Sequence, residues 1–285
     1  MPESPGSRAV LVTGAAGGIG TAITQALARR GYRVYAGVHN DRLHLDVMPE
    51  VQAIHLDVTS AESVRAAAAE VTARQGSHGL RAVVNNAGVI VQGSLELVPA
   101  DELQRQFAVN VFGPAEVTHA FLPLLRAAKG RLINISAPTA RLTVPYAGPI
   151  SASKAALESL SDATRVELAP WGIRVVIVVP GGVDTGIFAK AETAAKAALA
   201  ATDPDRVALY SRQPVAAAQS RMSTSRPQTV ADAVVRAVEA PKPKTRYAAT
   251  SDARLFALLS RLPARTRDRL LTRTLGLHKA TAGLS

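Results

Sequence analysis

The stretch that decides the fold reads Thr13-Gly14-Ala15-Ala16-Gly17-Gly18-Ile19-Gly20. It joins a strand-like apolar run, Ala9–Thr13, to a helix expected over Thr21–Arg30. Glycine permits the tight turn and lets the backbone approach a pyrophosphate closely, and the helix that follows offers unpaired N–H groups and a positive dipole end. A glycine cluster alone is weak evidence, but a strand before it and a helix after it are the context that a dinucleotide site requires.

Strands and helices continue to alternate after this turn. The strands are nearly continuous apolar runs, as is typical of strands covered on both faces, and we expect them over Arg33–Val38, Val51–Leu56, Leu80–Asn85, Gly130–Ser136, Ile173–Val179 and Thr245–Ala249. Helices are expected over Ser60–Gln75 (with Thr59 as its cap), Pro99–Val111, Ala115–Ala128, Ser151–Ala169 and Thr229–Glu239. This alternation predicts an α/β fold, a single-domain Rossmann-type doubly wound parallel sheet with helices on both faces.

The expected domain organisation is simple. Residues 1–7 form a flexible N-terminus, residues 8–250 the dinucleotide-binding domain, and residues 251–285 an apolar and basic C-terminal extension. Within the domain, residues 186–228 are expected to form either a substrate lid or a flexible insertion, because a long alanine-rich and polar stretch without strand character is unusual inside a compact domain.

Composition excludes several classes of function. The 285-residue chain has no cysteine, which excludes disulfides, thiolate catalysis and cysteine-ligated zinc, and no metal site is expected. No apolar run is long enough to span a bilayer and no signal peptide is visible, so a cytoplasmic location is expected. The net charge of +11 fits a solvated, arginine-rich surface, and with 4% aromatic residues and no nucleic-acid motif we expect no nucleic-acid partner.

Further motifs follow the glycine turn in a fixed order, namely Asp57-Val58, Asn85-Asn86-Ala87-Gly88, Asn110, Ser151-Ala152-Ser153-Lys154 and Pro180-Gly181-Gly182-Val183-Asp184-Thr185. In these motifs and in its glycine spacing the chain resembles the short-chain dehydrogenase/reductase family from Thr13 to Thr185. The resemblance implies a nicotinamide dinucleotide cofactor, whose contacts it assigns to Gly14, Gly18, Ile19, Gly20, His39, Asp57, Val58, Asn86, Ala87, Gly88, Lys154, Gly181, Val183 and Thr185.

The end of the second strand bears on the choice between NADP and NAD. NAD-dependent members of the family usually place an acidic residue there, to hold the ribose 2′-hydroxyl. Here the position holds Val38, followed by His39, which is a weaker phosphate partner than the arginine that NADP-dependent members often carry there. The missing acid favours NADP, and NAD stays the alternative.

The resemblance also assigns a catalytic site, and that site is incomplete. Family members use a Tyr as general acid/base, a Lys four residues later on the same helix face, a Ser that orients the substrate oxygen and an Asn that supports a water. Asn110 and Lys154 match the Asn and the Lys. Ile150 stands at the Tyr position and Ala137 at the Ser position, so both lack the functional group.

Three nearby side chains, those of Tyr146, Ser136 and Ser151, are candidate surrogates, although Ser151 can instead cap the helix that it opens. Tyr146 is the nearest phenol, although a pocket or packing role also explains it. Ser136 is one residue from the Ser position, and a shift of one residue along a strand turns the side chain to the other face. Positioned acid/base catalysis contributes about 10²- to 10⁴-fold, so ordinary ketone reduction is expected to be poor unless another group substitutes.

Three classes of function remain open. The first is an NAD(P)-dependent oxidoreductase with an atypical active site, acting on a substrate that needs no Tyr, such as an iminium ion or an activated C=C bond. The second is a non-redox enzyme on the same scaffold, such as a cyclase, dehydratase, isomerase or aldol-type catalyst. The third is a catalytically silent nucleotide-binding partner protein.

The remaining expectations concern the substrate and the partners. Ile187, Phe188 and Leu199 in the lid indicate a moderately apolar small molecule. The arginine-rich tail, Leu255–Leu277, resembles the C-terminal extension of family members that act on lipids, and its contact with a membrane surface is an alternative to packing on the lid. The resemblance implies a homodimer or homotetramer formed through the helices near residues 101–121 and 151–169.

Overall fold

The computed structural model describes residues 8–39, 48–210, 224–275 and 277. The expected flexible N-terminus, residues 1–7, lies outside the described residues, as do residues 211–223 of the expected lid and most of the chain after 275.

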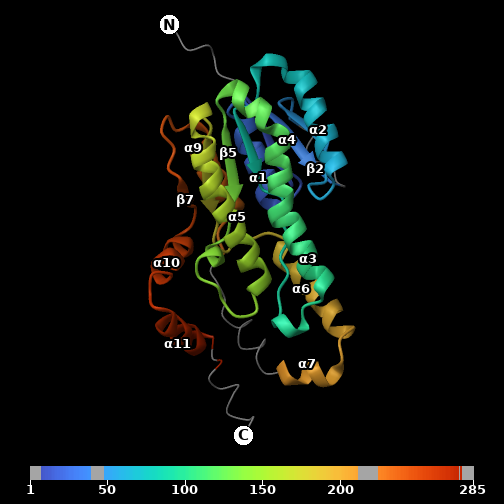
Figure 1. The fold of residues 1–285 in the computed structure, drawn as a ribbon, viewed down its shortest axis with the longest axis vertical. Helices are drawn as coiled ribbons and strands as arrows, with labels where there is room; N and C mark the ends of the chain where they lie inside the picture. Colours follow the sequence, from blue (N-terminus) through green and yellow to red (C-terminus); the bar gives the residue numbers. More distant parts are fainter. Residues whose placement is uncertain (1–7, 40–47, 211–223, 276, 278–285) are drawn as a thin grey trace.

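The fold is organised around one sheet of seven parallel strands in the order β3-β2-β1-β4-β5-β6-β7, which confirms the predicted architecture (Figure 1). The order reverses between β1 and β4, and ligands of open α/β sheets bind at the carboxyl ends of the strands at such a point. The strands are β1 (Ala9–Thr13), β2 (Arg33–Val38), β3 (Val51–His55), β4 (Ala82–Asn85), β5 (Arg131–Ile135), β6 (Arg174–Val179) and β7 (Arg246–Ala248).

Helices cover both faces of the sheet. α1 (Gly18–Ala28) and α9 (Pro227–Glu239) pack on one face, while α2 (Ala61–Gln75) and α4 (Gly113–Ala128) pack on the other. Successive residues of β1 therefore join different cores: Val10 packs with α1 and α9, and Leu11 packs with α2 and α4. Because neighbouring side chains point to opposite faces, a strand buried on both sides is apolar throughout.

The structure corrects the ends of several predicted elements. α1 begins at Gly18 rather than Thr21, since the glycine-rich turn itself leads into the helix. The predicted cap of α2 is wrong: Ser60 Oγ accepts the Ser63 amide at 3.2 Å, while the Thr59 hydroxyl donates to the Asp57 carboxylate at 2.7 Å. α5 (Gly148–Glu167) begins three residues before the predicted Ser151.

The helix predicted over Pro99–Val111 is two elements. α3 (Ala100–Phe107) is regular, and the next five residues, Ala108–Phe112, widen into a π-helical segment that runs directly into α4. π-Helical turns inside α-helices are rare and often lie at functional sites, and this one contains Asn110. Short 3-10 turns occur at Gly76–His78, Leu95–Leu97, Pro138–Ala140 and Ala169–Trp171.

The expected lid is helical where it is described. It contains α6 (Ile187–Ala200) and α7 (Pro204–Tyr210), and α7 is tied to the loop after β4, because the Tyr210 hydroxyl donates to the Glu96 carboxylate at 2.6 Å. The C-terminal extension forms α10 (Ser251–Leu259) and α11 (Ala264–Thr274), beyond the end of β7 (Figure 1). Within the described ranges, no helix combines the length and the apolar character needed to span a membrane.

Arginines at the amino ends of the strands satisfy the last carbonyls of α9. Arg131, the first residue of β5, donates from one terminal nitrogen to the Ala237 carbonyl and from the other to the Ala240 carbonyl, the latter at 2.5 Å. Burial lowers the pKa of Arg131 to about 10, so the guanidinium stays charged at neutral pH and also complements the negative end of the helix dipole.

We expect Arg131→Met to lower the free energy of unfolding by about 2 kcal/mol, because carbonyls at the end of α9 lose charged donors. Arg174→Met is the matched control, since Arg174 pairs with Arg131 in register on β6 but is exposed. The measurement is urea denaturation at pH 7, in which the control should move by less than about 0.5 kcal/mol. Equal losses in the two variants would contradict this role of Arg131.

Candidate active site

The phosphate turn is built by close approaches between backbone segments. Gly14 has a positive φ of +62°, and a Cβ there would lie 2.8 Å from the Cα of Ala87. A Cβ on Gly20 would lie 2.1 Å from the Gly14 carbonyl oxygen, and one on Gly18 would lie 2.7 Å from the Thr185 side chain. The turn therefore touches the Asn-Asn-Ala-Gly segment and the loop after β6, so three of the predicted motifs meet at the start of α1.

Hydrogen bonds fix the turn to the end of β4. The Thr13 hydroxyl accepts the backbone N–H groups of Asn86 and Ala87, each at 3.0 Å. In return, the Asn86 side-chain amide donates to the carbonyls of Thr13 and Gly14 at 2.9 and 3.1 Å. Asn86 therefore stabilises the conformation of the turn from the end of β4.

The adenosine end of the predicted site lies at the ends of β2 and β3. His39 Nε2 is 3.5 Å from the Asp57 carboxylate, and both side chains are at least partly exposed. Burial alone raises the pKa of Asp57, but hydrogen bonds from Thr59 and the charges of His39 and His55 outweigh it and lower the pKa overall. The Val58 side chain is buried beneath Gly113 of α4.

Lys154 lies buried at the centre of the site. Its Nζ donates to the Ile135 carbonyl at 2.8 Å, at the end of β5. A Cβ on Gly88 would lie 3.8 Å from this Nζ and 3.4 Å from Asn110 Oδ1, so the structure brings together Gly88, Asn110 and Lys154 as predicted. Burial lowers the pKa of Lys154 to about 8.

Asn110 and an additional residue, Gln106, hold the chain after β4. Asn110 Oδ1 accepts the Val89 amide at 2.9 Å, and its Nδ2 donates to the Val89 carbonyl at 3.0 Å. Gln106 accepts the Val91 amide at 2.6 Å and donates to Ser153 Oγ at 3.1 Å. Sequence reasoning missed Gln106 and Ser153; a glutamine one turn before Asn110 on the same helix face was the available signal.

Apolar side chains occupy the two positions that the family resemblance assigns to the catalytic Tyr and Ser. Ile150 is buried on α5, one helical turn before Lys154, and Ala137 follows β5 in an extended conformation. The neighbouring Ser136 hydroxyl donates to the Glu158 carboxylate at 2.8 Å. The candidate surrogate Ser136 therefore has its proton engaged by a buried carboxylate.

Tyr146 lies in the loop before α5, on the wall of a pocket of about 540 Å³. The pocket is also lined by residues of the loops after β4 and β5 and of α11, among them Leu95, Val144 and Leu271. Tyr146 has a φ of +65°, which is strained for a residue other than glycine, and its carbonyl accepts the Gly93 amide at 2.8 Å. Burial raises the pKa of the Tyr146 phenol, so the phenol is protonated at neutral pH.

The loop after β6 is held by a carboxylate that sequence reasoning did not find. Asp252, in the first turn of α10, accepts the Gly182 amide at 2.8 Å, and a Cβ on Gly181 would lie 2.0 Å from the same carboxylate. Gly181 is therefore required for the approach of the C-terminal extension, while Val183 is buried and pairs with Ser225 in a parallel bridge. In the ranges that the structure describes, no group of three or more His, Cys, Asp or Glu side chains is arranged to hold a metal ion.

In this parallel sheet, the glycine turn lies where the strand order reverses, and its close backbone contacts leave no room for side chains. This arrangement defines a Rossmann-type dinucleotide-binding protein. The family model for short chain dehydrogenase matches residues 8–196, and the chain belongs to that family. A solved short chain dehydrogenase from Burkholderia cenocepacia J2315, in complex with NADP, superimposes with a TM-score of 0.73 and 28% identity, covering 95% of this chain and 98% of the other.

Two relatives show how far the similarity extends along the chain. Estradiol 17-beta-dehydrogenase 2 of Rattus norvegicus is 40% identical over 189 residues, which are 63% of this chain and 49% of the relative, so the match spans about half the length of that protein. The NADPH-dependent 3-dehydrocapnine reductase of Ornithobacterium rhinotracheale is 32% identical over 278 residues, which are 94% of this chain and 97% of the relative.

The lowered pKa of Lys154 predicts a pH dependence of stability. The unfolded lysine titrates near 10.5 and the folded one near 8, so between these values the unfolded chain holds more protons and stability rises with pH. We expect the free energy of unfolding, relative to that of Lys154→Met, to increase by about 2 to 3 kcal/mol between pH 7 and pH 10. Urea denaturation across this range measures it, and a constant difference between the two proteins would contradict the lowered pKa.

Proposed function

We propose that this protein is an NADP(H)-dependent oxidoreductase that acts on a moderately apolar small molecule without the family's tyrosine acid. The observation that carries the proposal is the buried Ile150, one turn before Lys154, in a chain that keeps the glycine turn and the residues expected to bind the dinucleotide. In this proposal the protein lacks the group that would deliver a proton to the substrate, and it keeps the residues that bind the dinucleotide.

The choice of NADP rests on the end of β2 and on two similar proteins. β2 ends at Val38, followed by His39, so the position carries no carboxylate that would repel a 2′-phosphate. Arginine-rich composition and a net charge of +11 also favour an anionic ligand. A similar reductase is NADPH-dependent, and a similar structure was solved with NADP.

The described residues fit this cofactor. The backbone around Gly14, Gly18 and Gly20 would cradle the pyrophosphate at the start of α1, and Lys154 would hold the nicotinamide ribose. When bound, the cofactor supplies the hydride. Val183 and Thr185, in the loop after β6, would border the nicotinamide, with Asp252 holding that loop in position.

Proton supply decides the substrate class. Reduction of a ketone leaves an alkoxide, and the Ile150 side chain can neither protonate nor stabilise it. An iminium ion becomes a neutral amine when it accepts a hydride, so it needs no proton. Hydride addition to an activated C=C bond leaves a delocalised enolate, which water can protonate at carbon. Tyr146 keeps its proton at neutral pH but lies in the loop before α5, at a different position from the family's tyrosine.

Restoring the missing groups should restore ketone reduction. We expect Ile150→Tyr combined with Ala137→Ser to raise the rate of NADPH-dependent ketone reduction by about 10²-fold or more, since both a proton donor and an orienting hydroxyl return. Ile150→Phe with Ala137→Ser is the control, because it adds the ring without the phenol. The readout is the loss of NADPH absorbance with panels of ketones, imines and enones.

The outcomes separate the oxidoreductase from the other two classes of function. Turnover of imines or enones by the unaltered protein supports the proposal. Tight NADPH binding without turnover of any panel member favours the non-redox enzyme or the silent nucleotide-binding protein. A double variant that folds and binds NADPH but gains no ketone reduction would show that Ile150 does not occupy the tyrosine position.

We also propose that the protein is a homo-oligomer assembled through α4 and α5. Large apolar side chains are exposed beside and on these helices: Phe112, which directly precedes α4, is 65% accessible, and Leu160 and Val166 on α5 are 46% and 71% accessible. Leu160→Glu with Val166→Glu should convert a dimer or tetramer into a monomer in sedimentation velocity, while Leu255→Glu on α10 should not. A monomeric unaltered protein would refute this assembly.

A further inference from the structure

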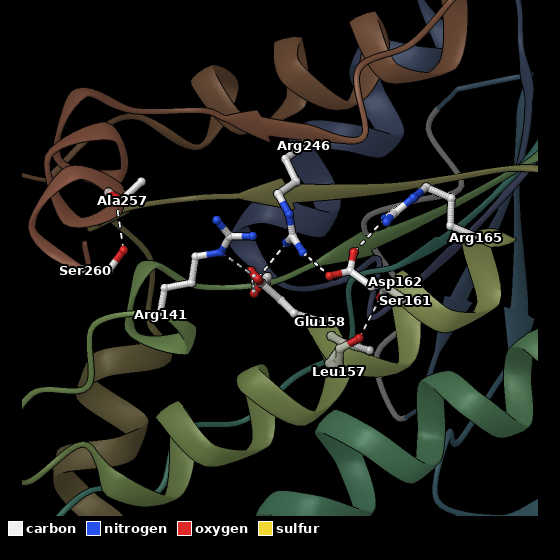
Figure 2. Close-up of polar contacts among 10 residues, drawn as sticks. Arg141, Leu157, Glu158, Ser161, Asp162, Arg165, Arg246, Ala257 and Ser260 are labelled. Carbon is white, nitrogen blue, oxygen red and sulfur yellow. Dashed lines mark hydrogen bonds and ion pairs between the residues drawn. The ribbon is translucent and has the colours of Figure 1, made fainter. Parts of the chain in front are cut away.

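A buried carboxylate organises the charged side chains beside the pocket. Glu158 lies on α5, one turn after Lys154, with its side chain 8% exposed. One carboxylate oxygen accepts the Ser136 hydroxyl, and the other accepts Nε of Arg141 at 3.1 Å and a terminal nitrogen of Arg246 at 2.6 Å (Figure 2). Two arginines therefore share one carboxylate.

Arg246 has a second acidic partner, and Arg141 does not share it. Arg246, on β7, also donates to Asp162 at 2.6 Å, and Asp162 in turn pairs with Arg165 at 2.6 Å. The cluster of Arg141, Glu158, Asp162, Arg165 and Arg246 holds three positive and two negative charges, as the ion pairs show. The cluster as a whole carries one excess positive charge, and it adjoins the pocket through Arg141, which is also part of the pocket lining.

Arg141 contacts the buried carboxylate through the Nε atom of its guanidinium. That atom donates to Glu158, while the Arg141 side chain is 45% exposed and forms part of the pocket lining (Figure 2). Two terminal N–H groups in one plane match the oxygens of a carboxylate or phosphate. Since Glu158 is buried and fixes Nε, the guanidinium is held in place before any ligand binds, which lowers the entropic cost of binding.

The pocket itself combines apolar walls with this charge. Leu95, Val144, Pro145 and Leu271 supply apolar surface, while Arg267 adds a second positive charge and Asp268 one negative charge. With Arg141 the lining carries one net positive charge. The pocket also includes Gly148, the first residue of α5, so it opens two residues before Ile150.

We propose that Arg141, positioned by Glu158, binds an anionic group of the substrate, so that the substrate is an apolar molecule that carries a carboxylate, phosphate or sulfonate. This inference rests on the proposed function in taking the pocket as the substrate site. Arg141 is then a specificity-determining residue, and the apolar walls hold the remainder of the molecule. Arg267 adds to the positive potential at the pocket from α11.

The test compares ligands of the same apolar length with and without charge. Decanoate, decyl phosphate, decyl sulfonate and decanol are titrated by calorimetry into NADPH-saturated protein. We expect at least one of the anions to bind ten times or more tightly than decanol, and the ranking of the three anions to identify the group. Arg141→Gln should remove that preference and leave decanol affinity within twofold.

The control and second variants keep the result decisive. Arg65→Gln removes the same charge from an exposed site on α2, and it should leave the preference unchanged. Arg141→Lys keeps a positive charge beside Glu158 without the planar pair of donors, and it should retain part of the preference. NADPH affinity and circular dichroism report whether each variant is folded; if Arg141→Gln is not, Arg141→Lys and Arg267→Gln decide, and each must lower the preference.

Three results would overturn the inference: equal binding of anions and decanol, a preference that survives Arg141→Gln, or no binding of any of these probes. The result is separable from the proposed function. If the anion preference is lost in Arg141→Gln but no substrate is turned over with NADPH, the binding site is supported and the oxidoreductase function is rejected. Turnover confined to neutral substrates, with no anion preference, would do the reverse.

Discussion

The rest of the structure depends on the absence of side chains where the first strand meets the first helix. The backbone at Gly14 lies against Ala87, Gly20 lies against Gly14, and Gly18 lies against Thr185, each at a distance that excludes a Cβ. These approaches bring the ends of β1 and β4 and the loop after β6 to one place. They also leave the start of α1 open to phosphate groups, since the capping residue Gly17 has no side chain.

Hydrogen bonds to the chain after β4 shape the interior around Lys154. Asn110 and Gln106 clamp the chain after β4 through backbone hydrogen bonds, and the π-helical segment places Asn110 over Val89. Lys154 is thereby enclosed, with its Nζ on the Ile135 carbonyl and its pKa lowered by burial. With Ile150 one turn away on α5, no phenol stands at the position that the family resemblance assigns to the tyrosine, and the role that we propose for Lys154 is to hold the nicotinamide ribose.

The C-terminal extension belongs to the site rather than to its surroundings. Asp252 at the start of α10 holds the Gly181–Gly182 loop, and α11 forms part of the pocket wall next to Tyr146. β7 brings Arg246 to Glu158, which in turn fixes Arg141. A network of charges therefore links the last strand, the helix that carries Lys154 and the wall of the pocket.

The sequence by itself predicted the alternation of strands and helices and the glycine turn between β1 and α1, and the family resemblance assigned Ile150 and Ala137 to the Tyr and Ser positions, an assignment that stays a prediction. These follow from local properties: apolar periodicity, glycine spacing and a known motif order, which need no knowledge of distant contacts. The sequence did not predict helix ends such as the cap at Ser60. Adjacent Ser and Thr residues can both cap a helix, and the hydrogen-bond partners that lie near them decide which one does. Only the tertiary structure decided that Asp252 reaches Gly182 and that Glu158 joins Arg141 to Arg246, since those partners lie 70, 17 and 88 residues apart. Contacts at such separations depend on how the elements pack, and no periodic pattern in the chain records them.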